Sequence, residues 1–256
     1  MLNTVRGFFG LLWMPALVAG AQTPPAAAAP SYAVVSEVGQ QLQVVGFKEQ
    51  TGTRLDSNLR SRINLTGGAL DKVALLATQR ALNRAAPGAP VFMVSPLDVE
   101  LFSAIGNPVV GQMLQLPADL AAALKQQGST RLPLINRREA DTNFQALDNR
   151  LGSGRITGPG FYVERTTVIR NVDKGESAQG FLPTFAYLNL SPVDLRDGRV
   201  LATQPVTDSR LDIAPVSTDS GHPWDSVSND YKMANLQLLV RVAVEQTVPV
   251  LLNVKP

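Results

Sequence analysis

The chain contains no cysteine, one histidine and few aromatic residues, which make up 6% of its 256 positions. The usual zinc ligand sets, which combine cysteine with histidine, are therefore excluded. The sequence also lacks a D-x-[DN]-x-[DN]-G calcium loop and a G-x-S-x-G nucleophile motif. We accordingly expect neither a metal nor a cofactor. The sequence favours a protein that is not an enzyme, without deciding the point.

An excess of charge of one sign is also lacking. The 23 lysines and arginines stand against 21 aspartates and glutamates, so the net charge is only +2. No basic field of the kind that binds nucleic acid follows from this balance, and we expect no nucleic-acid partner. With 45% hydrophobic and 17% charged residues, the composition is that of a globular domain and excludes disordered and collagen-like chains.

The first 21 residues have the three parts of a signal peptide. Arg6 supplies a positive charge, residues 7–18 are mostly apolar, and Ala19-Gly20-Ala21 is a small-x-small cleavage site before Gln22. The apolar run is shorter than the roughly 20 residues that a spanning helix needs. We expect an exported, periplasmic bacterial protein with no membrane span after cleavage. The alternative is an inner-membrane protein anchored by its uncleaved N-terminus.

The segment after the cleavage site, residues 22–31, is rich in proline and alanine and is expected to be an extended linker. Residues 32–256 are then expected to form a single domain, because no further linker interrupts them. The first half of this domain predicts the following elements: an N-terminal hairpin at 32–47 around Gly39-Gln40, a loop at 51–68, an alanine-faced helix at 70–86, a buried strand at 91–94, a helix at 117–127, an edge strand at 131–136 containing Pro133, and a charged helix at 137–151.

The second half of the domain is dominated by strand patterns. Residues 161–170 and 185–195 alternate with a period of two, and 199–206 is expected to pair back across Asp197-Gly198. A helix is predicted at 224–248, closed by Pro249, with a last apolar piece after it. The expected class is α/β (α+β): a mixed sheet with an N-terminal hairpin, a C-terminal antiparallel meander, and packing helices that include a long C-terminal one.

A glycine-rich segment at 152–160 (GSGRITGPG) is the first candidate site. Its backbone amides, together with Arg155, could hold an anion or a phosphate. The candidate ligand residues here are Gly152, Gly154, Arg155, Gly158 and Gly160. The segment is neither a dinucleotide fingerprint nor a P-loop, because no helix and no Lys-Ser/Thr follow it. The pattern favours instead a flexible connection between a helix and the meander.

The only histidine, His222, lies in the segment STDSGHPW at 217–224. Residue types of a hydrolytic triad are close to it in sequence: Ser217, Asp219, Ser220 and Asp225. The alternative interpretation is a surface loop that leads into a helix cap. A hydrolase or a small-ligand binder would require the 152–160 loop and the His222 loop to meet at one pocket.

Two further features bear on binding. A second glycine-rich stretch, residues 171–180, joins two strands and is long for a hairpin, and such loops tend to carry either function or disorder. Arginines also occur in pairs with acidic residues nearby, which predicts ion-paired surfaces: Arg60, Arg62, Arg137, Arg138, Arg150 and Arg155 with Asp56, Glu139, Asp141 and Asp148.

The segments GFYVERTTVIRN (160–171) and GFLPTFAYLNLSPVDLRDG (180–198) resemble exported proteobacterial proteins of uncharacterised function. The helix at 117–127, the strand after it, Asn136-Arg137-Arg138-Glu139, and Asp194 spaced as D-x-x-x-G with Gly198 are similar to a broader superfamily. That superfamily includes the curli-secretion lipoprotein, the penicillin-binding-protein activators and the amino-terminal domain of TolB. The resemblance covers about residues 70–210 and implies an interaction module without catalytic residues. The chain departs from the lipoproteins in having no lipobox cysteine.

These observations together favour an exported, non-catalytic interaction module with an envelope protein as its partner. The alternative is a small-ligand binder or hydrolase that uses the 152–160 loop and His222.

Overall fold

The computed structural model describes residues 29–49, 56–94, 108–146, 149–170, 177–212 and 222–252. The expected signal peptide and most of the expected linker lie outside these residues. The helices are η1 (Thr66–Gly68), α1 (Ala69–Ala85), α3 (Ala118–Gln126) and α4 (Asn229–Leu252). The strands are β1 (Tyr32–Glu37), β2 (Gln41–Gly46), β3 (Leu59–Asn64), β4 (Val91–Met93), β5 (Val109–Val110), β6 (Met113–Leu114), β7 (Arg131–Arg137), β8 (Glu139–Asp141), β9 (Phe144–Ala146), β10 (Asn149–Leu151), β11 (Arg155–Arg170), β12 (Ser177–Asp194), β13 (Arg199–Val200) and β14 (Gln204–Asp212).

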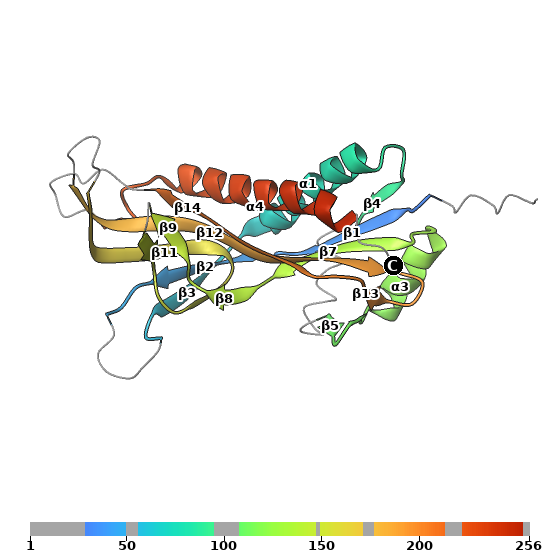
Figure 1. Ribbon diagram of the computed structural model, residues 1–256, viewed down its shortest axis with the longest axis horizontal. Coiled ribbons are helices and arrows are strands. Elements are labelled where there is room, and N and C mark those ends of the chain that lie inside the picture. The colour runs from blue at the N-terminus through green and yellow to red at the C-terminus, as the bar shows by residue number, and fades with distance from the viewer. Residues whose placement is uncertain are drawn as a thin grey trace, which may run out of the picture.

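A large mixed sheet organises the domain, with helices packed on both of its faces (Figure 1). The long strand β12 pairs with β11 and then β7 along one edge, and with β14 and then β13 along the other. Helices α1 and α4 cover one face, and α3 covers part of the other face (Figure 1). The expected class, a mixed α+β fold with a C-terminal meander and a long C-terminal helix, is confirmed.

Two helices follow the sequence pattern closely. Helix α1 buries small side chains, including Ala74, Ala77 and Ala81, which lets α4 and the sheet approach it closely. Helix α4 buries Leu236, Val240 and Val244 in the same core. It begins at Asn229, later than expected, and Pro249 lies inside its last turns instead of closing it. Among the described residues, none of the helices combines the length and hydropathy that crossing a membrane requires.

The predicted N-terminal hairpin is wrong, although both of its strands exist. β1 pairs in parallel with β4 and β7, whereas β2 pairs with β3 and β11. The two strands therefore run one after the other instead of folding back. Asp71 of α1 holds the connection in this path: its carboxylate accepts hydrogen bonds from the Gly39 N–H (3.1 Å) and the Ser36 hydroxyl (2.7 Å). Asp71 lies in the first turn of α1, where an acidic residue is favoured, but no local pattern predicts its contact with the strands.

Exposed edge strands explain two further differences. The predicted loop at 51–68 contains β3, whose six residues are all exposed and pair only with β2 among the described strands. Because no face of β3 is buried, its sequence does not show the usual alternation. The strand at 91–94 exists but is not wholly buried: among the described strands β4 pairs only with β1, and Phe92 and Met93 are 37% and 45% exposed, whereas Val94 is buried.

The predicted charged helix at 137–151 is also wrong, because this segment forms the end of β7 and the short strands β8, β9 and β10. β8 pairs with the start of β11, and β9 pairs with β10. Charged residues suit these short strands because one side of each faces solvent. The buried exception is Phe144, which packs with Tyr162 and Phe185 on the face of the sheet opposite α4.

β7 is an interior strand and not an edge strand, despite Pro133. It lies between β1 and β12, and Pro133 stands opposite Pro192. The Pro192 carbonyl accepts a hydrogen bond from Leu201 N–H on the far side of β12. The nitrogen and the carbonyl of one strand residue point to the same side, so both of these groups of Pro192 point away from β7. Pro133 and Pro192 therefore form a pair without hydrogen bonds, and neither proline removes a hydrogen bond from the β7–β12 ladder. The predicted pairing after Asp197-Gly198 is confirmed, with β13 returning onto Val193 and Asp194.

Replacing Ala81 with leucine tests the close packing between α1 and α4. Ala81 is fully buried, so the larger side chain should overpack the interface and lower the free energy of unfolding by about 1–3 kcal/mol. Urea unfolding measures this change. Ala85→Leu on the same helix is the control, because Ala85 is exposed. An equal effect of the two substitutions would contradict the packing argument.

Glu37, at the end of β1, provides a test of the same region through pH. Burial, reinforced by the nearby Asp71 carboxylate, raises the pKa of Glu37 from 4.5 to about 7. Its protonated form therefore stabilises the fold fully below about pH 4.5, and that contribution is lost as the pH rises through about 7. Glu37→Gln should unfold like the unsubstituted chain in acid but be more stable by roughly 2–3 kcal/mol at about pH 8.5. A constant difference across this pH range would count against the raised pKa.

Candidate functional site

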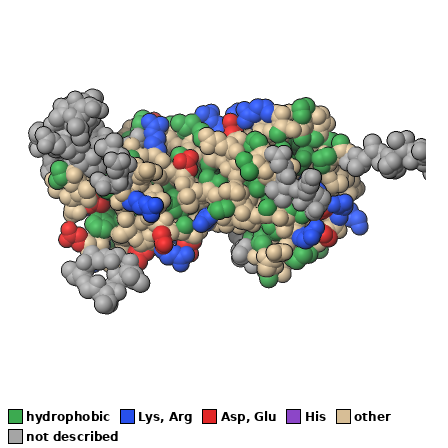
Figure 2. Space-filling view, in the orientation of Figure 1, with side chains coloured by type: hydrophobic (Ala, Val, Ile, Leu, Met, Phe, Trp, Pro, Cys, Tyr) green, Lys and Arg blue, Asp and Glu red, His purple; other side chains and the backbone are tan. Residues whose placement is uncertain are grey.

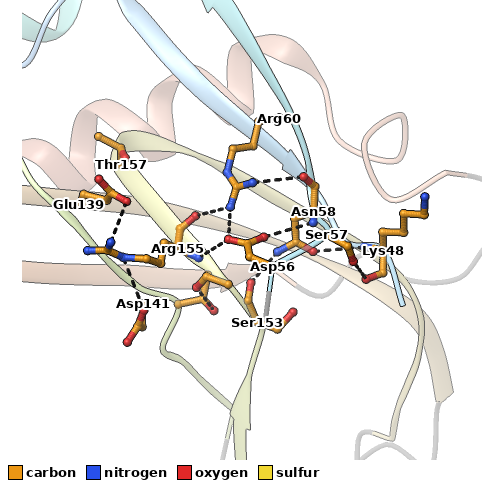
Figure 3. Close-up of polar contacts among 12 residues, drawn as sticks. Lys48, Asp56, Ser57, Asn58, Arg60, Glu139, Asp141, Ser153, Arg155 and Thr157 are labelled. Carbon is orange, nitrogen blue, oxygen red and sulfur yellow. Dashed lines mark hydrogen bonds and ion pairs between the residues drawn. The ribbon is translucent and has the colours of Figure 1, made fainter. Parts of the chain in front are cut away.

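The glycine-rich segment lies where β10 ends and β11 begins, and its second half, from Arg155, is strand. It is therefore not a connection out of a helix. Asp56, which precedes β3, inserts its carboxylate beside Gly154 and Arg155 (Figure 3). A Cβ at Gly154, where φ is +77°, would lie 2.6 Å from the Asp56 carboxylate, so only glycine allows this approach.

The Asp56 carboxylate collects donors from both segments (Figure 3). It accepts hydrogen bonds from the backbone N–H of Arg155 (2.9 Å), the backbone N–H of Asn58 (3.2 Å) and the guanidinium of Arg60. Burial alone would raise the pKa of Asp56, but these hydrogen bonds outweigh burial and lower it. The glycine-rich loop thus does bind an anion, and that anion is a side chain of the same protein.

Arg155 points away from Asp56 and pairs with β8 (Figure 3). Its guanidinium lies 3.3 Å from a Glu139 carboxylate oxygen and 3.8 Å from one of Asp141. The predicted ion pairing of the arginines is confirmed here and for Arg60 with Asp56. Because Arg155 is more than half exposed, these pairs contribute little stability. The arrangement leaves no uncompensated positive charge at Arg155.

The remaining loop residues contribute to packing. The Asn58 side-chain amide donates to the Ser153 carbonyl (2.6 Å), and the Ser153 N–H donates to the Tyr162 hydroxyl (3.1 Å). Gly152 leaves room for the Phe144 ring, and Gly160 lets the Gln43 carbonyl of β2 approach β11 more closely than any Cβ would permit. Gly158 lies against Arg137. Asp56 and Asn58 are the residues that sequence analysis does not assign to this site, although an aspartate two residues before an asparagine is a common turn signal.

His222 lies near the start of α4, and its Nδ1 accepts a hydrogen bond from the Trp224 N–H (3.1 Å). Burial, together with the charge of Arg165, lowers the pKa of His222 below its usual value. Asp225 donates its N–H to the His222 carbonyl, as expected for a helix-entry turn. Ser217, Asp219 and Ser220 lie outside the described residues.

The structure does not bring His222 and Arg155 together. Trp224 packs edge-on against Phe161 on the α4 side of the sheet, whereas the Ser153 loop contacts Tyr162. Phe161 and Tyr162 are consecutive in β11, so they point to opposite faces. Arg155 and Arg165, which neighbours His222, are also ten strand positions apart, roughly 30 Å. Among the described residues, no group of histidine and carboxylate side chains suited to a metal ion occurs.

Comparisons with known proteins give no family. No protein-family model and no curated protein sequence matches the chain. Its structure is similar to that of a neuraminyllactose-binding hemagglutinin homolog from Helicobacter pylori, at 11% identity and a TM-score of 0.42, covering 88% of each chain. It is also similar to the PelC dodecamer from Paraburkholderia phytofirmans, at 12% identity and a TM-score of 0.30, covering 89% of this chain and 91% of that one. At these TM-scores neither similarity supports an argument about function.

Replacing Asp56 with asparagine tests whether this carboxylate organises the loop. The substitution keeps the size of the side chain but removes the charge that Arg60 and the Arg155 N–H bind, so the free energy of unfolding should fall by about 1–3 kcal/mol at neutral pH. Because the folded-state pKa is lowered, Asp56 stabilises the fold above its usual pKa of 3.8, and that contribution is lost as the pH falls through the lower folded value.

Urea unfolding at several pH values would measure this effect, and the two chains should converge in acid. Asp141→Asn is the matched control, since the Asp141 side chain is 89% exposed and only its ion pair with Arg155 is lost. It should change stability by less than about 0.5 kcal/mol. Equal losses in the two variants would show that Asp56 has no special role.

Proposed function

We propose that the chain is an exported, non-catalytic interaction module that binds a protein of the bacterial cell envelope. The binding element in this proposal is the end of the β11–β12 ribbon, residues 165–170 and 177–181, which we call the arm. The signal-peptide pattern and the superfamily resemblance of the sequence support the location and the class of activity. The geometry of the arm supports the choice of surface.

The arm extends beyond its neighbours in the sheet. Along β11, pairing with β2 ends at Val163. Along β12, pairing with β14 begins only at Leu182, so residues 177–181 precede it. Beyond these positions β11 and β12 pair with each other, and no other described strand joins them. The outer edges of the arm are thus unpaired with any other described strand, although the N–H groups of Thr166 and Thr167 donate to the Glu164 carboxylate. Open strand edges of this kind commonly pair with another chain, and an isolated ribbon is only marginally stable.

The arm also exposes an apolar side chain at its edge, because Val168 is 67% exposed. Arg165 and Thr166 are exposed beside it. The space-filling view shows lysines and arginines interspersed with acidic residues on the face of the domain that it presents (Figure 2). A polar surface with a projecting apolar edge favours a protein partner over a nucleic acid.

The alternative, a small-ligand binder or hydrolase, has less support from the geometry. An anion that entered the 152–160 loop would have to displace the Asp56 carboxylate from the Arg155 N–H. His222 would not assist, because it lies on the opposite face of the sheet. Binding of a protein partner at the arm does not require the Asp56 carboxylate to be displaced.

A photo-activatable amino acid placed at Val168 tests the proposal in cells that export the protein. Because Val168 is at the arm edge, irradiation should yield one reproducible cross-linked product with an envelope protein, identified by mass spectrometry. Val250 of α4 is the matched control, since it is also apolar and 59% exposed but lies away from the arm. The same products from both positions, or none from Val168, would refute the arm as the binding element.

A further inference from the structure

The large sheet has a seam where two strands meet end to end along β12. β7 pairs with β12 up to Leu188, and β11 takes over at Tyr187. Two backbone hydrogen bonds close this junction: Arg138 N–H donates to the Tyr187 carbonyl, and Gly158 N–H donates to the Arg138 carbonyl, both at 3.0 Å. On the other side of the seam, the turn from β1 to β2 passes through Gly39. The last residue of β7, Arg137, lies in this seam.

Gly158 leaves the space that the Arg137 side chain occupies, and Gly39 lies beside its terminal nitrogens at ordinary contact distance. A Cβ at Gly158 would approach the Arg137 Nε closer than real Cβ atoms do, and a Cβ at Gly39 would lie 3.9 Å from one of its terminal nitrogens. The guanidinium therefore lies between two backbone segments that have no side chains at those points. Since Arg137 is partly exposed, solvent reaches the group from one side.

The guanidinium of Arg137 lacks the partners that buried charges normally have. Its Nε is buried and has no hydrogen-bond acceptor, and no described carboxylate forms an ion pair with it. Asp71 is near enough to attract it, but the Asp71 oxygens accept hydrogen bonds from Ser36 and Gly39. A second cation, Arg62 of β3, is close enough to repel it. Burial, followed by this repulsion, lowers the pKa of Arg137.

The seam thus differs from the Asp56 site, because the nearby Asp71 carboxylate bonds to Ser36 and Gly39 instead of to a guanidinium. At Asp56 the protein supplies both the cation and the anion. At the seam it supplies two guanidinium groups, one of them largely enclosed and still charged at neutral pH, because arginine does not lose its proton in proteins. Leaving a buried donor unpaired costs free energy, which an oxygen acceptor would recover.

We propose that Arg137 and Arg62 bind a small oxyanion, a phosphate or a carboxylate, at the seam between β7 and β11. Either group fits the planar fork of a guanidinium and accepts two parallel hydrogen bonds from it. The site is distinct from the arm and does not depend on the proposed function, so failure of either proposal leaves the other standing.

Titration of the full chain with sodium phosphate and, separately, sodium acetate tests the proposal. Sodium chloride at matched ionic strength is the reference, and heat release in a calorimeter is the readout. Binding of at least one oxyanion should be saturable with a stoichiometry of one. Arg62→Gln, at an exposed position, should weaken it about tenfold, and Arg137→Gln should abolish it. Arg241→Gln on α4 is the control and should bind like the unsubstituted chain.

A second measurement needs no variant, in case Arg137→Gln does not fold. Phenylglyoxal modifies accessible arginines, and peptide mass spectrometry locates the modified sites. The oxyanion that binds should slow modification of Arg137 relative to the exposed Arg241. The proposal is overturned if neither oxyanion binds more than chloride does, if Arg62→Gln binds as the unsubstituted chain does, or if Arg137 and Arg241 are protected equally.

Discussion

The fold depends on the length of β12, because a single strand of 18 residues connects almost every other part of the sheet. Its neighbours are shorter, so each edge is shared by two strands in succession: β11 and β7 on one side, β14 and β13 on the other. Its side chains alternate between cores, with Leu182, Ala186 and Leu188 facing α4 and Phe181, Phe185 and Tyr187 facing the opposite side. A disruption of β12 would therefore disturb the packing on both faces of the sheet.

Charged side chains lie at the ends of several strands of the sheet, and two of the carboxylates form hydrogen bonds with groups of the same chain. At the C-terminal end of β12, hydrogen bonds from Arg196, aided by Arg131, lower the pKa of the buried Asp194 to about 2. At the start of β11 the Asp56 carboxylate has the corresponding role. Among the described residues, Arg137 is one of five with a buried polar side-chain atom that has no hydrogen-bond partner, and unlike Asp56 it has no ion-pair partner of opposite charge.

Sequence reasoning predicts those parts of the fold in which burial repeats along the chain. Helices α1 and α3 are examples, because one face of each is buried. The long strands β11 and β12 are recognised by their runs of β-branched and aromatic residues, although both of their faces are buried. It fails for β3 and β4, since the edge of a sheet leaves their side chains exposed. It also fails for the pairing of β1 and β2, because that pairing is decided by Asp71 and by strands β7 and β11, which lie far along the chain.

At the candidate site, too, the sequence predicts some of the contacts and misses others. The glycines and Arg155 are conspicuous in the sequence, and acidic residues near the arginines predict the ion pairs. Asp56 is missed as the bound anion because its partner, the Arg155 N–H, is 99 residues away in the chain. No local pattern encodes a contact of that separation. A glycine-rich loop therefore predicts that an anion binds there, but not whether the anion comes from the chain itself or from solution.

A buried carboxylate, that of Glu164, also bonds to backbone N–H groups at the base of the arm. The ladder between β11 and β12 is irregular between Glu164 and Val168. The buried Glu164 carboxylate accepts hydrogen bonds from the N–H groups of Thr166 (2.6 Å) and Thr167 (2.8 Å), so the irregular backbone is satisfied. Opposite, Gly180 packs against the Glu164 carbonyl and Pro223. The direction in which the arm leaves the domain is thus fixed by the domain itself. A surface ordered before binding loses less conformational entropy when a partner binds, which is consistent with the proposal that the arm is the binding element.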